Sequence, residues 1–222
     1  MHTVWLLDFD DTLASGPVTW GYQRALPQFA AAHNLALDPD ALAEGLLVAQ
    51  EQAAVSTDLV PILDQFFARM GWPKALQQTL LQDVQENYAP ELFEDTLAFL
   101  ERLRRAGQTV FVLSNNPRAP RHVERLGLGA LIDEVVTPHM LAGAGPKPER
   151  SLWDQLVRRF PFVQADCAVV VGDDPWSDLA FAQVCQVRAW LVDRHDRFGG
   201  LALDSGVRRV TTLDAVVLDA SG

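Results

Sequence analysis

The chain has 222 residues and a mass of 24.5 kDa, with 49% hydrophobic and 21% charged residues. This length allows one compact domain or a core with a smaller inserted domain, and the apolar content excludes a largely disordered chain. The formal net charge of -11 disfavours nucleic acid and anionic membranes as partners, because both repel an acidic surface.

The first predicted element is a strand over Val4–Phe9, an apolar run that ends in an acidic segment. The run is too short and too soon acidic for a signal peptide, and no segment has the apolar length of a membrane span. The two cysteines, Cys167 and Cys185, are too few for a disulfide framework and fit a reducing compartment. We therefore expect a cytoplasmic protein, as a monomer or homodimer.

Helical patterns follow the first strand, with no strand signal between them. They cover Trp20–His33, Pro39–Gln52, Leu59–Met70 and Pro73–Tyr88. Asp38 is expected to cap the second of these helices, and Gly71 to end the third.

Helices and strands alternate from Phe93 onward. Strands are predicted at Thr109–Leu113, Glu134–Thr137, Cys167–Val171, Ala189–Val192 and near Arg209–Thr211, and helices at Asp95–Ala106, Arg118–Leu126, Ser151–Phe160 and Ser177–Val184. This alternation is typical of βαβ units, so we predict an α/β fold with a parallel sheet covered by helices on both faces. Residues 1–14 and 91–222 are assigned to this core, and residues 15–90 to an inserted helical domain.

Polar residues follow three of the predicted strands, where ligands of parallel sheets bind. They are Asp8, Asp10 and Thr12; Ser114, Asn115 and Asn116; and Asp173, Asp174 and Asp178. Each aspartate taken singly is explained by a turn or a helix cap, but together the carboxylates would repel one another unless a cation offset them. Oxygen ligands without clustered histidine or cysteine favour a hard ion such as Mg²⁺.

Among the lysines and histidines, one residue, Lys147, is a candidate for the site. The chain has only two lysines, Lys74 and Lys147, against 16 arginines. Lys147 lies in a Pro-rich loop, where its compact ammonium either points at an oxyanion or is solvated. The histidines show no metal-ligand spacing and are expected at the surface or in loops; they are His2, His33, His122, His139 and His195.

The order of these residues resembles the four motifs of the haloacid dehalogenase superfamily. The motifs are Asp8-Phe9-Asp10-Asp11-Thr12, Ser114-Asn115, Lys147, and Gly172-Asp173-Asp174 with Asp178. The resemblance implies a Rossmann-like core, and the position of the insertion looks like the helical cap of the phosphoglycolate-phosphatase-like branch. Asp11 stands where glycine is frequent in this family, and Glu149 stands where a second proline is often seen.

The resemblance also implies catalytic roles. Asp8 would be the nucleophile that forms an aspartyl-phosphate, and Asp10 the general acid and then the general base. Thr12 would orient the loop of the nucleophile. Ser114, Asn115 and Lys147 would bind the phosphoryl group of the substrate.

Metal binding is implied by the same motifs. Mg²⁺ would be held by Asp8, by the backbone carbonyl of Asp10 and by Asp173, with Asp174 or Asp178 completing the inner or outer shell.

The leading hypothesis is a Mg²⁺-dependent phosphatase that acts on a small phosphorylated metabolite. Asp10 favours phosphate esters over halides, because displacement of a halide needs no acid for the leaving group. A sugar-phosphate mutase of the same superfamily and a non-catalytic binding or regulatory module are the alternatives. Tyr22 and Arg24 are either substrate contacts or ordinary residues of the helical cap.

Overall fold

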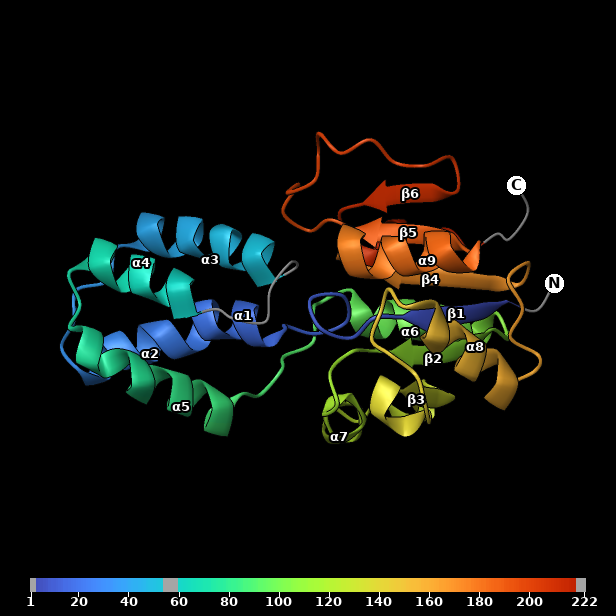
Figure 1. Cartoon of the computed structure of the whole chain (residues 1–222), viewed down its shortest axis with the longest axis horizontal. Coiled ribbons are helices and arrows are strands. Elements are labelled where there is room, and N and C mark those ends of the chain that lie inside the picture. The colour runs from blue at the N-terminus through green and yellow to red at the C-terminus, as the bar shows by residue number, and fades with distance from the viewer. Residues whose placement is uncertain (1–2, 54–59, 219–222) are drawn as a thin grey trace. The chain divides into compact units, whose positions relative to one another are not determined.

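The computed structural model describes residues 3–53 and 60–218 (Figure 1). Two residues named above, His2 and Leu59, lie outside this range. The chain divides into two compact units, one of Met1–Ala14 with Leu92–Gly222 and one of Ser15–Glu91.

The first unit is built on a sheet of six strands. The strands are β1 (Val4–Leu7), β2 (Thr109–Leu113), β3 (Glu134–Val136), β4 (Ala168–Gly172), β5 (Arg188–Val192) and β6 (Val207–Val210). Their order is β3-β2-β1-β4-β5-β6, and every neighbouring pair is parallel. The predicted α/β fold with a parallel sheet is thus confirmed.

Alternate residues of each strand pack on opposite faces of the sheet. In β1, Val4 and Leu6 belong to one hydrophobic cluster and Trp5 and Leu7 to another. The first cluster is covered by α8 (Arg150–Arg159) and α9 (Ala180–Cys185), and the second by α6 (Thr96–Arg105) and α7 (Ala119–Arg125). Helices therefore cover both faces, as predicted, and strands buried on both sides explain the nearly continuous apolar runs in the sequence.

The central strand β1 lies between β2 and β4, and this position is where the order of the sheet reverses. From β1 the chain order runs outward through β2 and β3 on one side and through β4, β5 and β6 on the other. In parallel sheets of this order, ligands bind at the carboxyl ends of the strands that flank the reversal. Here those strands are β1, followed by Asp8, and β4, followed by Asp173.

The second unit consists of helices. They are α1 (Pro17–Trp20), α2 (Leu26–Ala32), α3 (Pro39–Ala53), α4 (Val60–Met70) and α5 (Gln77–Asn87). Its core is rich in aromatic residues, with Phe29, Phe66 and Phe67 around Trp72. The Asp38 side chain accepts a hydrogen bond from the backbone N–H of Asp40 at 3.0 Å, which confirms the predicted cap of α3.

The first predicted helix of this unit differs from the structure. It begins earlier, at Pro17. Proline suits the first turn of a helix because it lacks an N–H, and the N–H groups of that turn have no partner within the helix. It is then interrupted by a π-helical turn over Gly21–Ala25 before α2. Pro27 lacks an N–H and cannot continue the α-helical hydrogen bonds, which accounts for the local change of helix type.

One histidine was assigned wrongly. His122 lies in α7, is only 5% exposed and stacks against Phe9 with 6.0 Å between ring centroids. It therefore belongs to the core of the sheet unit rather than to a loop or the surface. His33, His139 and His195 are exposed, as expected.

Burial makes a testable difference between the two cysteines. Cys185 is 2% exposed, and burial raises the pKa of its thiol to about 12, whereas Cys167 is half-buried. At pH 8 almost no thiolate forms at Cys185, so we expect iodoacetamide to alkylate it more than about tenfold more slowly than Cys167. Peptide mass spectrometry of the native protein measures both rates, and equal rates would show that α9 is not packed as described.

Candidate active site

The loop after β1 turns sharply and returns its polar side chains to the end of the sheet. Asp11 has φ of 59°, in the left-handed region that glycine adopts most easily and aspartate tolerates. This explains how Asp11 stands at a position where glycine is frequent. Thr12 is fully buried, and its hydroxyl donates to Asp173 Oδ1 at 3.4 Å. The carbonyl of Thr12 accepts a hydrogen bond from Arg194, which fixes the loop from the other side.

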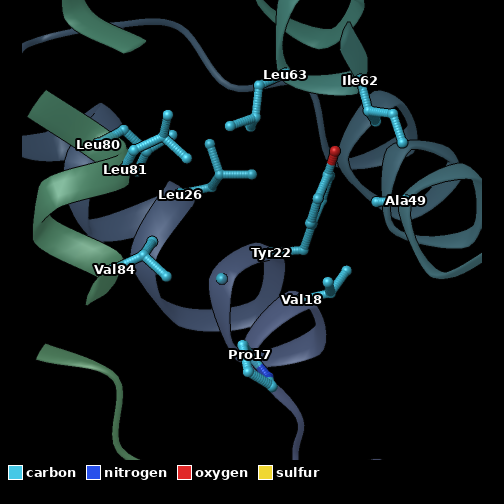
Figure 2. A pocket seen from close by; sticks show the side chains of 11 residues that line it. Pro17, Val18, Tyr22, Leu26, Ala49, Ile62, Leu63, Leu80, Leu81 and Val84 are labelled. Atoms are coloured by element: carbon cyan, nitrogen blue, oxygen red, sulfur yellow. The ribbon is translucent and has the colours of Figure 1, made fainter. Parts of the chain in front are cut away.

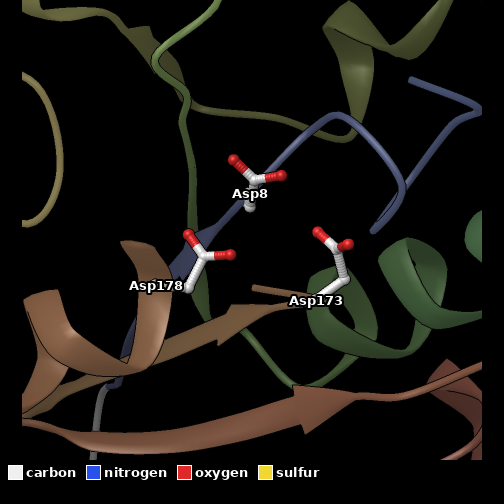
Figure 3. Close-up of side chains that lie close together, drawn as sticks. All are labelled: Asp8, Asp173 and Asp178. Atoms are coloured by element: carbon white, nitrogen blue, oxygen red, sulfur yellow. The ribbon is translucent and has the colours of Figure 1, made fainter. Parts of the chain in front are cut away.

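Three aspartates converge at the ends of β1 and β4. Asp8, Asp173 and Asp178 each offer a carboxylate oxygen within 4.8 Å of the other two. Figure 3 shows the three carboxylates side by side, Asp8 from the loop after β1 and Asp173 and Asp178 from the segment after β4. Asp178 comes so close to the backbone that a Cβ on Gly172 would lie 2.1 Å from its Oδ2. Glycine is therefore required at that position.

Lys147 joins two of these carboxylates. Its ammonium donates to Asp8 at 2.6 Å and to Asp178 at 2.5 Å, and its side chain is only 3% exposed. The backbone around Lys147 is tied to the end of β2 by a reciprocal pair of hydrogen bonds with Asn115, of 2.8 Å and 3.2 Å. Lys147 is thus part of the site and not a solvated loop residue.

Residues that follow β2 also contact Asp10. Asn116 donates from Nδ2 to Asp10 Oδ2 at 2.8 Å, while its backbone N–H donates to Ser114 Oγ at 3.1 Å. Ser114 is buried beside these groups. Asn116 received no role from the sequence, because nothing in its spacing showed which of the two adjacent asparagines would face Asp10.

Two further candidates for metal binding lie outside the carboxylate cluster. Asp174 accepts hydrogen bonds from the backbone N–H groups of Trp176 and Ser177, so it caps the helical turn Pro175–Leu179 that leads into α9. Asp10 is expected to bind the metal through its backbone carbonyl, and its side chain accepts a hydrogen bond from Asn116. Within residues 3–53 and 60–218, neither joins the cluster of Asp8, Asp173 and Asp178.

The electrostatics of the cluster follow from its burial. Loss of solvation raises the pKa of Asp8 well above its usual value; Asp178 and Asp10 raise it further, and Lys147 opposes them. Burial likewise raises the pKa of Asp173, and Asp11 adds to the effect. Burial lowers the pKa of Lys147, but Asp178 and Asp8 outweigh it and the net shift is upward. Burial also raises the pKa of Asp174 to about 6.

The donor set fits a hard divalent cation. Three buried carboxylates lie close together, and the raised pKa values of Asp8 and Asp173 indicate that the protein alone stabilises their anionic forms insufficiently. The cluster contains carboxylate oxygens and no sulfur or imidazole ligand. Such a set suits Mg²⁺ better than a soft transition metal.

A second cation near the cluster was missed in the sequence. Arg197 donates from Nη2 to Asp173 Oδ2 at 3.0 Å, and its side chain is 8% exposed. It follows β5 in a charged segment that resembles an ordinary surface loop. Only the adjacency of β5 to β4 brings this loop to Asp173.

Arg24 and Tyr22, the two candidate substrate contacts of the helical unit, both have contacts within that unit. Arg24 forms an ion pair with Glu91. Tyr22 is 5% exposed and stands along one side of an apolar cavity of about 110 Å³ that Leu26, Leu63 and Val84 also line (Figure 2). Tyr22 therefore contributes to the interior of this unit.

A family model described as haloacid dehalogenase-like hydrolase matches residues 3–185 of the chain. The match covers most of the sequence, and the chain belongs to this family of hydrolases. The superfamily inferred from the four motifs is confirmed. None of the curated proteins compared with the chain matches it.

Solved structures share the fold at low sequence identity. The HAD-hydrolase YfnB from Bacillus subtilis, bound to magnesium, has a TM-score of 0.70 at 15% identity, with 96% of each chain covered. A HAD family hydrolase from Deinococcus radiodurans, with bound phosphate and sodium, has a TM-score of 0.68 at 19% identity, with 95% of this chain and 91% of that chain covered. A HAD phosphatase from Thermococcus onnurineus has a TM-score of 0.58 at 20% identity, with coverage of 96% and 95%.

Helices of membrane-spanning length and apolarity were sought in the described part of the chain, and none of its helices qualifies.

The two lysines provide a matched test of the buried ion pairs. Lys147→Met leaves Asp8 and Asp178 buried without their shared cation, and we expect it to reduce the free energy of unfolding by about 3–5 kcal/mol in the presence of a chelator. Lys74→Met removes the ion pair of Lys74 with Asp64, in which the lysine side chain is 77% exposed, and should change stability only slightly. Urea unfolding measures both, and losses of equal size would contradict the buried geometry.

Proposed function

We propose that the protein is a Mg²⁺-dependent phosphatase that hydrolyses small phosphorylated metabolites through an aspartyl-phosphate at Asp8. The observation that carries the proposal is the position of Asp8, which is buried against Lys147 and clustered with Asp173 and Asp178. A carboxylate with a cation beside it and a metal-binding set around it is equipped to attack a phosphoryl group, whose charge the cations offset.

In the first step, a carboxylate oxygen of Asp8 attacks phosphorus and forms an acyl-phosphate bond, while the bond from phosphorus to the ester oxygen of the substrate breaks. Asp10 donates a proton to that oxygen, so that the product leaves as a neutral alcohol. The hydrogen bond from Asn116 holds the Asp10 carboxyl group in a fixed orientation for this transfer.

In the second step, a water molecule attacks the phosphorus of the aspartyl-phosphate. Asp10, now a carboxylate, accepts a proton from the water, and the bond from phosphorus to the Asp8 oxygen breaks. Asp8 is regenerated as a carboxylate and inorganic phosphate is released. Asp10 thus returns to its protonated form for the next turnover.

The remaining candidate residues bind the phosphoryl group and position the loop of Asp8. Lys147 offsets negative charge on Asp8 and the phosphoryl group, and Ser114 and Asn115 supply donors for the phosphoryl oxygens. Thr12 holds the nucleophile loop through its hydrogen bond to Asp173.

The metal would be held by Asp8, Asp173 and Asp178 together with the backbone carbonyl of Asp10, while Asp174 caps the adjacent helical turn. Bound Mg²⁺ supplies positive charge that stabilises the phosphoryl oxygens.

Ligands bound to structures of the same fold support this assignment. YfnB was solved with magnesium and the Deinococcus radiodurans hydrolase with phosphate, and both share the fold of this chain. A small phosphorylated metabolite as substrate and a cytoplasmic location are part of the same proposal. A mutase would use the same two aspartates, so release of free phosphate is the observation that separates the two activities.

We expect the purified protein to hydrolyse p-nitrophenyl phosphate with Mg²⁺ and to lose this activity when a chelator is added. Asp8→Asn removes the nucleophile and should abolish turnover. Asp83→Asn, in α5 of the helical unit and hydrogen-bonded to Asn87, should not change it. Release of nitrophenol and phosphate is measured together. Full activity of Asp8→Asn, or activity that survives the chelator, would refute the mechanism.

Asp10→Asn tests the second acid separately. Nitrophenol leaves without a proton, so the first step should survive, whereas the second step loses its base and slows by about 10²–10⁴-fold. Rapid mixing should then show a burst of about one equivalent of nitrophenol, followed by slow turnover. A slow reaction with no burst would mean that Asp10 is not the base for hydrolysis of the intermediate.

A further inference from the structure

The loop after β5 is fixed by a fully buried carboxylate. Asp193 accepts hydrogen bonds from the backbone N–H groups of Arg197 at 2.8 Å and Phe198 at 2.9 Å. Phe198 in turn packs edge-on against Trp176 with 5.4 Å between ring centroids. The backbone of Arg197 is therefore anchored next to the segment that carries Asp173.

The side chain of Arg197 is directed at the metal-binding set. Its guanidinium lies 4.8 Å from the centroid of the Phe198 ring and donates to Asp173 Oδ2 at 3.0 Å. With 8% of the side chain exposed, solvent screens this charge only weakly, and among the described residues the Nε atom has no hydrogen-bond partner. Asp173 is the anion that compensates Arg197.

Arg197 and a divalent cation would therefore both interact with the Asp173 carboxylate. In their ionised forms Asp8, Asp173 and Asp178 carry three negative charges, and Lys147 and Arg197 balance two of them. A divalent cation held by the same three carboxylates would lie close to Arg197 and would be repelled by it. Binding of the ion and the pairing of Arg197 with Asp173 then oppose each other.

We propose that Arg197 is an internal counter-ion that competes with the divalent cation for Asp173 and so weakens binding of that cation. The inference rests on the Mg²⁺ site of the proposed function. The arginine stabilises the protein when the metal is absent and keeps the metal site exchangeable. Lys147 differs from Arg197 because it pairs with Asp8 and Asp178 and leaves Asp173 to the arginine.

Whether removal of Arg197 strengthens or weakens metal binding distinguishes this role from a merely structural one. If Arg197 only oriented the Asp173 carboxylate, its removal would disorder a metal ligand and weaken metal binding. If it competes with the metal, its removal strengthens binding and destabilises the metal-free protein. Arg197→Met keeps an apolar stem of similar length and removes the charge.

The experiment is calorimetric titration of the full chain with Mg²⁺ at one neutral pH, after removal of metals by a chelator. We expect Arg197→Met and Arg197→Gln to bind Mg²⁺ about tenfold more tightly than the parent, since each removes a unit charge next to a ligand. Arg197→Lys should bind like the parent. Arg69→Met, which removes an exposed arginine paired with Glu44, controls for the change in net charge.

Thermal melting gives a second readout that does not depend on turnover. Arg197→Met should melt at a lower temperature than the parent without metal, and Mg²⁺ should raise its melting temperature by more than it raises that of the parent. Arg197→Gln provides the same test if Arg197→Met fails to fold. Unchanged or weaker binding in the neutral variants would overturn the role of Arg197 alone.

Absence of Mg²⁺ binding in the parent and in every variant would overturn both the inference and the proposed metal-dependent function. Tighter binding by the neutral variants, together with no hydrolysis of phosphate esters by the parent, would support the inference and refute the proposed function. The two failures are therefore distinguishable.

Discussion

The contact of Lys147 with both Asp8 and Asp178 is the interaction on which the site depends. Like charges this close and this well buried cannot all stay ionised without a cation among them. The Lys147 ammonium, on a side chain that is 3% exposed, partly relieves that repulsion. It also ties the loop of Lys147 to the end of β1 and to the helical turn Pro175–Leu179. The raised pKa values of Asp8 and Asp173 show that the relief is incomplete, and this leaves a site that attracts a further cation.

The sheet explains why this arrangement forms at one place. The order of the strands reverses at β1, so the loops after β1 and β4 diverge there and leave room for polar side chains. Gly172 then lets Asp178 approach the end of β4 more closely than any side chain at that position would allow. The helical unit contributes its own aromatic core, which makes it a separately packed body inserted between β1 and β2.

The solved structures illustrate how little sequence identity this fold requires. YfnB shares the fold at 15% identity, and the Thermococcus onnurineus phosphatase at 20%. Buried strands accept many apolar residues of similar size, because packing depends on shape more than on identity. The buried ion pairs of Lys147 with Asp8 and Asp178 have less freedom, since their charges must balance at short distances. A few ordered polar residues consequently identify the family where overall similarity is low.

The sequence by itself determined the α/β class, the parallel sheet and the presence of a helical insertion, because the periodicity of apolar residues follows directly from burial of each element. It also located Asp8, Asp173, Asp178 and Lys147, since each lies in a motif at the end of a strand or in a loop. Tertiary structure decided the rest. The contact of Asn116 with Asp10 and that of Arg197 with Asp173 depend on which loops become neighbours, and no local pattern encodes that. Asp174 shows the same limit: its place in a motif does not reveal that it caps a helical turn, because competition between backbone donors and a metal for one carboxylate is settled only by three-dimensional geometry.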